Sequence, residues 1–201
     1  MTRIAVLVSG GGTNLQALIN AWKKKELSGG ELQLVISSKA GVRAIERARK
    51  AGIKTVTVER EKPARNEFDS EILKILDEDK IDLVVLAGFL RVLGERITAK
   101  YKDKIINIHP SLIPSFCGRG YYGLRVHEAA LDYGVKLTGA TVHFVNNEID
   151  GGKIILQKAV TVKEGDTAET LQKRVMRTAE WKILPRAVAM FCRGELRQEQ
   201  T

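Results

Sequence analysis

The chain has 201 residues, and few of them are of the kinds that bind metals or form covalent crosslinks. It contains two cysteines and three histidines. Cys117 and Cys192 lie far apart, which is neither a disulfide framework nor a metal-ligand spacing. The histidines form no i, i+4 pair or other zinc signature, so we expect no bound metal. Arg119 is the only cation fixed close to Cys117, so we do not expect a thiolate nucleophile there.

Aromatic residues are also scarce, at 5% of the chain. A nucleic-acid-binding surface needs aromatic side chains for base stacking and a patterned basic patch. The net charge of +9 could attract a polyanion, but the positive residues are scattered along the sequence. We therefore expect small anionic substrates and no nucleic-acid partner.

Long apolar runs are missing. No run approaches the ~20 residues of a membrane-spanning helix, so we expect no membrane association. Residues 1–6 are typical of a short strand and not of a signal peptide, which favours a cytoplasmic protein. There is no linker, repeat or low-complexity tract, and we expect a single domain over residues 1–201.

Hydrophobic periodicity predicts alternating strands and helices. Strands are expected at 3–8, 32–37, 54–58, 82–87, 104–108, 138–145 and 153–162, and helices at 13–25, 41–51, 65–79, 94–101, 124–132 and from 167. This order predicts an α/β fold, a Rossmann-like doubly wound and mostly parallel sheet with an antiparallel C-terminal strand pair. Thr13 with Gln16, and Asp166 with Glu169, could form capping boxes. Pro185 is expected to end or kink the last helix.

An amide and an imidazole stand two residues apart at the end of an apolar run. Asn107 and His109 would face the same side of a strand, and Pro110 and Pro114 stiffen the exit from it. Histidine can move a proton near neutral pH, and asparagine can donate to a developing oxyanion. The pair resembles half of an acyl-transfer site without its nucleophile or orienting acid.

A carboxylate that could complete the pair lies in a later turn, where Asp150 and Gly151 connect the last two expected strands. Taken alone, an Asp-Gly pair is ordinary turn chemistry. A single histidine at a strand end is likewise often a packed or surface residue. The residue pattern alone therefore leaves open whether Asp150 and His109 act together.

Three consecutive glycines, Gly10 to Gly12, join the first expected strand to the first expected helix. Such a loop lets the backbone approach a phosphate, and the free N–H groups of the helix start point at it. The dinucleotide fingerprint is absent because Leu15 stands where a third glycine is needed, and no Gly-Lys-Ser/Thr of a Walker A loop follows. A plain glycine turn without a ligand remains the alternative.

Five segments together resemble one known family. They are Val8–Ala17, Val85–Leu93, Asn-x-His-Pro-Ser-Leu-x-Pro at 107–114, Thr-Gly-Ala-Thr-Val-His-Phe-Val at 138–145 and Asp-Gly-Gly-x-Ile-Ile-x-Gln at 150–157. In this order they resemble the folate-dependent phosphoribosylglycinamide formyltransferases of purine biosynthesis. The similarity extends from Ile4 to about Ile183 and implies the formyltransferase fold.

The resemblance implies direct formyl transfer from the co-substrate 10-formyltetrahydrofolate to the amine of glycinamide ribonucleotide. The catalytic residues would be Asn107, His109 and Asp150. Asn107 and protonated His109 would stabilise the tetrahedral oxyanion, and Asp150 would raise the pKa of His109. The substrate amine is the nucleophile, which explains why no serine or cysteine nucleophile is evident.

The resemblance also implies the binding residues. The phosphate-binding half, about 1–100, would hold the ribonucleotide with Gly12, Thr13 and Asn14, and the second half, about 101–201, would add Glu180. The folate would contact Arg65, Leu90, Arg91, Val92, Leu93, Asn107, Asn146, Asn147, Glu148, Ile149 and Asp150. Leu90, Val92 and Leu93 could equally be plain core, and Arg65 a solvated helix charge.

Several features stay open. Gly120–Gly123 lengthens the link found in many family members, which leaves the role of His127 undecided. We expect His143 to be a structural residue that faces away from the catalytic set. No clear apolar stripe indicates the oligomeric state, so a homodimer stays open.

Three alternative functions deserve comparison. A formyltetrahydrofolate deformylase shares the Asn-x-His and late Asp pattern but usually carries an N-terminal regulatory domain. A methionyl-tRNA formyltransferase would need a C-terminal tRNA-binding domain. A non-enzymatic nucleotide- or RNA-binding module would leave the polar triad without a task.

Overall fold

The chain is described here by a computed structural model, which covers residues 1–59 and 65–196. Its strands are β1 (Thr2–Val8), β2 (Gly30–Ser37), β3 (Lys54–Thr57), β4 (Leu83–Leu86), β5 (Ile105–His109), β6 (Leu137–Phe144) and β7 (Ile154–Thr161). Its helices are α1 (Thr13–Lys23), α2 (Arg43–Lys50), α3 (Arg65–Glu78), α4 (Glu95–Lys100), α5 (Leu124–Tyr133), α6 (Ala168–Val175), the π-helix η1 (Met176–Glu180) and α7 (Trp181–Cys192). Every strand and helix expected from the sequence is present. Within the described ranges, no helix has the length and apolar character needed to cross a bilayer.

The strands form one sheet in the order β3-β2-β1-β4-β5-β6-β7. Strands β1 to β5 pair in parallel, whereas β6 is antiparallel to both β5 and β7. The predicted doubly wound sheet with an antiparallel C-terminal pair is therefore confirmed. The order reverses between β1 and β4, and ligands of such sheets bind outside the carboxyl ends of the strands at this point. The loops after β1 and β4 meet there, since Ser9 N–H donates to the Gly88 carbonyl at 3.1 Å.

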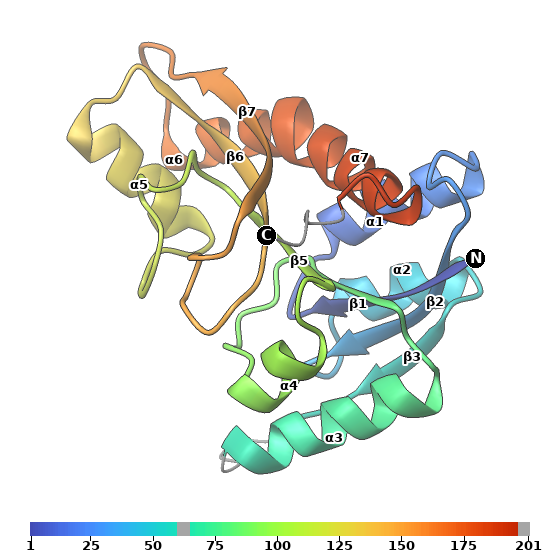
Figure 1. Ribbon diagram of the computed structural model, residues 1–201. Coiled ribbons are helices and arrows are strands. Elements are labelled where there is room, and N and C mark those ends of the chain that lie inside the picture. Colours follow the sequence, from blue (N-terminus) through green and yellow to red (C-terminus); the bar gives the residue numbers. More distant parts are fainter. Residues whose placement is uncertain (60–64, 197–201) are drawn as a thin grey trace.

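Two hydrophobic clusters fill the two faces of the sheet. Alternate residues of β1 divide between them, with Ile4, Val6 and Val8 on one face and Ala5 and Leu7 on the other. Helices α1, α2 and α7 cover the first face, and α3 and α4 cover the second (Figure 1). Strands buried on both faces explain the nearly continuous apolar runs in the sequence.

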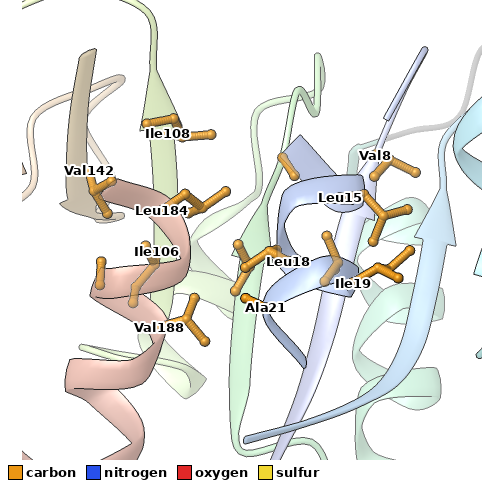
Figure 2. Close-up of a cluster of buried hydrophobic side chains, with 14 of the residues drawn as sticks. Val8, Leu15, Leu18, Ile19, Ala21, Ile106, Ile108, Val142, Leu184 and Val188 are labelled. Atoms are coloured by element: carbon orange, nitrogen blue, oxygen red, sulfur yellow. The ribbon is translucent and has the colours of Figure 1, made fainter. Parts of the chain in front are cut away.

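Helix α7 packs on the same face as α1. Figure 2 shows Leu15 of α1 beside Val8, while Leu184 and Val188 of α7 lie close to Ile106 of β5. All of these side chains are buried in one cluster. This packing holds the end of η1 near the start of α1, although the two are far apart in the sequence.

The same alternation leaves polar side chains on the opposite face of β5 and β6. Ile106 and Ile108 of β5 and Val142 of β6 belong to the first cluster, so Asn107 and His143 face the other way. The second cluster reaches β5 only at Ile105. The remainder of this face carries the polar residues.

Helix α1 begins differently from the expectation. Its N-cap is Gly12, which has φ +69° and makes no side-chain cap, so the predicted capping box of Thr13 and Gln16 is wrong. A Cβ at Gly12 would lie 2.7 Å from the Cβ of Ala44. Close packing of the loop on α2 therefore requires glycine here.

The C-terminal helical region also departs from the expectation. Thr167 is the N-cap of α6 and forms a capping box with Thr170. Asp166, the expected cap residue, instead binds the guanidinium of Arg174. Pro185 lies inside α7, which continues past it, so Pro185 does not end the helix. The π-turn η1 immediately precedes α7.

Candidate active site

Asn107 and His143 are register partners across the β5–β6 ladder. His143 Nδ1 lies 2.7 Å from the Phe144 carbonyl oxygen and donates to it. In the neutral ring Nε2 is then an acceptor, and Asn107 Nδ2 donates to it at 3.0 Å. The expectation that His143 faces away from the site is wrong. Antiparallel pairing of the two predicted strands would have placed His143 opposite Asn107 on the same face of the sheet. No hydrogen bond among the described residues uses the second amide proton of Asn107.

Asp150 lies between the two imidazoles. Its Oδ2 is 3.7 Å from His109 Nδ1, and its Oδ1 is 3.7 Å from His143 Nε2. The backbone N–H of Gly118 donates to Oδ2 at 2.8 Å. Asp150 has φ +56°, a conformation that costs energy in a residue with a Cβ and recurs at functional sites. The turn therefore points a largely buried carboxylate at both histidines.

His109 is 4% exposed, and its Nε2 donates to the Phe116 carbonyl at 2.9 Å. Burial lowers the pKa of His109, and although Asp150 and the Phe116 carbonyl raise it, the net direction is down. Asp150 therefore acts on the pKa of His109 in the expected direction, but the effect of burial is larger. The lowered pKa favours the neutral imidazole, and with the proton on Nε2 for the bond to Phe116, Nδ1 is the unprotonated nitrogen on the side of Asp150.

Asp150 is a carboxylate at neutral pH. Burial would raise its pKa, but the His143 imidazole, the positive charge that His109 carries when protonated and the Gly118 N–H together lower it. Cys117, which lies between Phe116 and Gly118, has a pKa raised by burial and by Asp150. A thiol with a raised pKa is a poor nucleophile. The site thus offers an anion, a neutral imidazole and an amide donor, which suits a nucleophile supplied by the substrate.

The glycine loop and Glu180 meet at the start of α1. Asn14 Nδ2 donates to Glu180 Oε2 at 2.5 Å, so the structure brings together two residues expected to bind the ribonucleotide. Complete burial raises the pKa of Glu180 to about 7. Asn14 Oδ1 is also buried and has no hydrogen-bond partner among the described residues. The π-turn η1 ends at Glu180 and places its carboxyl group here.

Arg47 of α2 lies beside the same loop and was not anticipated from the sequence. Its Nε donates to the Gly11 carbonyl at 2.9 Å, and Nη1 donates to Gln16 Oε1 at 2.8 Å. Arg47 and Thr13 also line a groove of about 590 Å³ between α1 and α7. Asn107, His109 and Asp150 do not line this groove, so it borders the glycine loop and not the candidate catalytic residues.

The expected folate residues divide into two groups. Leu90 and Val92 after β4 are 54% and 50% exposed, and Ile149 is 41% exposed, whereas Leu93 is buried in the core. Apolar side chains left exposed beside a polar site can form the walls of a pocket for a flat ring. Leu93 could contribute only its backbone.

Several of the remaining residues expected to bind the folate have partners within the protein. The Arg91 guanidinium lies 4.7 Å from the ring centre of Phe68. Asn147 accepts a hydrogen bond from Thr98 of α4, and Asn146 Oδ1 accepts one from the Glu148 N–H at 2.9 Å. These bonds shape the loop that carries Asp150. Arg65 opens α3, but its side chain lies outside the described residues.

His127 is fully buried in α5, and neither ring nitrogen has a hydrogen-bond partner among the described residues. Burial, with a smaller effect of the charge of His109, lowers its pKa to about 4. The folded protein therefore holds His127 neutral near neutral pH. His127 is close enough to His109 for a charge on His109 to affect its pKa, but no hydrogen bond among the described residues involves its ring.

We expect the His127→Leu variant to lose less free energy of unfolding than wild type as the pH falls below 6.5. Between pH 6.5 and about 4 the unfolded chain protonates His127 and the folded protein does not. His127 should therefore reduce the free energy of unfolding of wild type by about 3 kcal/mol across this window. The variant lacks this contribution. Urea unfolding at pH 7.5, 5.5 and 4 measures the difference. Parallel pH slopes for the two proteins would contradict the burial of a neutral ring.

Comparison with known proteins gives matches along almost the whole chain. A profile of the family described as Formyl transferase matches residues 2–188. Phosphoribosylglycinamide formyltransferase of Escherichia coli K12 is 40% identical over 198 residues, 98% of this chain and 90% of that protein. The Homo sapiens trifunctional purine biosynthetic protein adenosine-3 is 47% identical over 96% of this chain, which spans only 18% of that protein. The crystal structure of glycinamide ribonucleotide transformylase 1 from Symbiobacterium toebii matches with a TM-score of 0.92 and 41% identity, covering 100% of this chain and 92% of that one.

Proposed function

This chain belongs to the formyl transferase family, and we propose that it transfers the formyl group of 10-formyltetrahydrofolate to the amine of N1-(5-phosphoribosyl)glycinamide in purine biosynthesis. The observation that carries this proposal is the position of Asp150 between His109 and His143, with Asn107 hydrogen-bonded to His143. A relative that the chain covers almost completely is named for this activity. Both substrates are soluble metabolites, so we expect the enzyme to act in the cytoplasm.

The proposed ribonucleotide site is the loop before α1. Gly12 and Thr13 would present backbone N–H groups at a helix start to the phosphate, a common way to bind an anion. Asn14 and Glu180 would contact the remainder of the substrate. The unpartnered Asn14 Oδ1 supports this part of the proposal, because a buried acceptor normally has a donor.

The proposed folate site is formed by the segment after β4 and the loop after β6, and the first of these contacts Ser9 at the start of the glycine loop. Exposed Leu90, Val92 and Ile149 would enclose the flat ring, and backbone groups of the 87–93 segment would bind its polar edge. The loop of Asn146 to Asp150 would cover the other side. The formyl group would then lie next to Asn107.

In the proposed mechanism, the substrate amine attacks the formyl carbon. A carbon–nitrogen bond forms, and the carbonyl electron pair moves to oxygen to give a tetrahedral oxyanion. The free N–H of Asn107 donates to this oxygen, a role worth about 2.7–4 kcal/mol for one donor in a comparable site. The bond to the folate nitrogen then breaks, which leaves tetrahydrofolate and the formylated amine.

The amine must lose a proton and the folate nitrogen must gain one. His109 Nδ1 is unprotonated in the free enzyme and faces Asp150, so it can accept the amine proton directly or through water. The resulting imidazolium is stabilised by the adjacent carboxylate, and it can then donate the proton to the leaving nitrogen. The low starting pKa of His109 keeps it ready to accept at neutral pH.

Three acceptors in one assay test the proposal. Tetrahydrofolate release from 10-formyltetrahydrofolate is recorded with phosphoribosylglycinamide, with the same amine lacking its phosphate, and with no amine. We expect turnover with the first, at least ~100-fold lower kcat/KM with the second because the phosphate loop is left empty, and no turnover with the third. Equal turnover without an amine would instead identify a deformylase, and no turnover with any acceptor would favour a binding module.

A further inference from the structure

The segment after Pro114 contacts both members of the proposed catalytic pair through its backbone. The Phe116 carbonyl accepts from His109 Nε2 at 2.9 Å, and the Gly118 N–H donates to Asp150 Oδ2 at 2.8 Å. Buried Ser111 donates from its hydroxyl to the Ser115 carbonyl at 2.6 Å and holds the start of this segment. The conformation of Phe116 therefore decides where the hydrogen-bond acceptor of His109 lies.

Phe116 is held in an unfavourable backbone conformation. Its φ is +51°, the left-handed region that residues with a Cβ rarely adopt. Such a conformation persists only when the surroundings impose it, and it recurs at functional sites. Hydrogen bonds hold Ser115 before it and Gly118 after it, and the contacts of the Phe116 ring add a further restraint.

Two tyrosines contact the ring of Phe116. Tyr133, at the end of α5, meets it edge-on with ring centres 6.0 Å apart and planes at 73°. Tyr121 meets it at 6.5 Å and 59°. Both geometries are favourable for aromatic pairs. Tyr133 is 81% exposed and Tyr121 38%, so neither ring is there to fill the core, and both cover Phe116.

We propose that Tyr121 and Tyr133 are positioning residues that clamp Phe116, and through its carbonyl fix the orientation of His109. The inference rests on the proposed function for its kinetic consequences. It also assigns a role to the Gly120–Gly123 extension, which supplies Tyr121. Gly120 and Gly123 have φ +94° and +58°, so the extension can turn back towards Phe116.

Loss of the clamp should act on the chemical step. Without the tyrosine rings, Phe116 can relax from its left-handed conformation, and its carbonyl then moves away from His109 Nε2. A displacement of about 1 Å at a reacting group can lower a rate about 100-fold. Neither tyrosine belongs to the proposed substrate or folate sites, so we expect the change in kcat and not in KM.

The Phe116 carbonyl also favours the protonated imidazole, since it accepts from Nε2–H. Loss of this carbonyl contact should shift the pKa of His109 further down. Asp150 in the loop after β6, His143 on β6 and His127 on α5 continue to face the ring. This shift can be measured by NMR of the imidazole nitrogens without any substrate.

The variants are Tyr121→Leu, Tyr133→Leu and the double variant, with Tyr121→Phe and Tyr133→Phe as conservative replacements. Tyr122→Leu is the matched control, because Tyr122 lies in the same extension and is 48% exposed. Its ring packs against the Arg125 guanidinium, whose central carbon lies 5.1 Å from the ring centre. We expect each leucine variant to lower kcat about tenfold and the double variant about 100-fold, with KM within about twofold. The phenylalanine variants and Tyr122→Leu should keep the wild-type kcat and His109 titration.

The two measurements separate this inference from the proposed function. A downward shift of the His109 titration in the leucine variants alone would support the clamp, even for an enzyme that formylates a different acceptor. An unchanged titration and an unchanged kcat in the double variant would overturn it. An equal effect of Tyr122→Leu would also overturn it, since the cause would then be general loosening of the extension.

Discussion

Replacement of Asp150 by asparagine should lower kcat about 10²–10⁴-fold, the usual range for loss of a group that assists proton transfer. The amide keeps the shape of the side chain, can still accept from the Gly118 N–H and tolerates the positive φ of this position. The charge that stabilises the His109 imidazolium is lost. We expect little change in KM, because the folate and ribonucleotide contacts lie mainly elsewhere.

The pKa of His109 gives a second measurement on the same variant. Burial lowers this pKa and the charge of Asp150 partly offsets the effect of burial. Removal of that charge should therefore lower the pKa of His109 further. Steady-state kinetics and an NMR titration of the imidazole together test both expectations. Asp132→Asn, an exposed change on α5, is the matched control and should behave as wild type. A titration of His109 that moves upward in Asp150→Asn would contradict the arrangement described here.

Replacement of Glu180 by glutamine should stabilise the protein at alkaline pH and weaken substrate binding. The pKa of Glu180 rises from an ordinary 4.5 to about 7 in the folded protein. The folded state therefore keeps a proton that the unfolded chain releases above pH 4.5, and wild type loses stability as the pH rises from 4.5 to about 7. At pH 8 the variant should be more stable by about 3 kcal/mol, and at pH 4 the two should be equal.

The same substitution should raise KM for the amine substrate. Glutamine can still accept from Asn14 Nδ2 and can donate to the unpartnered Asn14 Oδ1, so the local fold should survive. Urea unfolding at pH 4, 6 and 8 gives the stability difference, and Glu128→Gln on the exposed side of α5 is the control. An equal stability difference at pH 4 and pH 8 would mean that Glu180 does not bind a proton on folding.

The fold was predictable because local patterns agree with it. Strands β1 and β4 are short apolar runs buried on both faces, and α1 presents Leu15, Leu18 and Ile19 at helical spacing. The family expected from five ordered motifs is confirmed by the match over residues 2–188. Helix starts were less predictable, since the cap at Gly12 depends on close contact with Ala44 of a different helix.

The candidate site was predictable in its residues but not in its electrostatics. Asn107, His109 and Asp150 were expected together, and the structure brings them together. The direction of the His109 pKa depends on burial by segments distant in sequence, which no local motif encodes. The contact between Phe116 and Tyr133 likewise depends on how α5 packs. His143 is different, because strand pairing and side-chain alternation could have placed it correctly.

The destination of the formyl carbon tests the proposed reaction most directly. The enzyme would be given 10-formyltetrahydrofolate with a ¹³C-labelled formyl group and an equal amount of phosphoribosylglycinamide, and the products followed by ¹³C NMR. Attack by the substrate amine beside Asn107 predicts that nearly all the label appears in the formamide of the ribonucleotide, and that omission of the amine leaves the folate intact. Label that appears as formate, with or without the amine, would show that water is the acceptor and would contradict the proposed transfer.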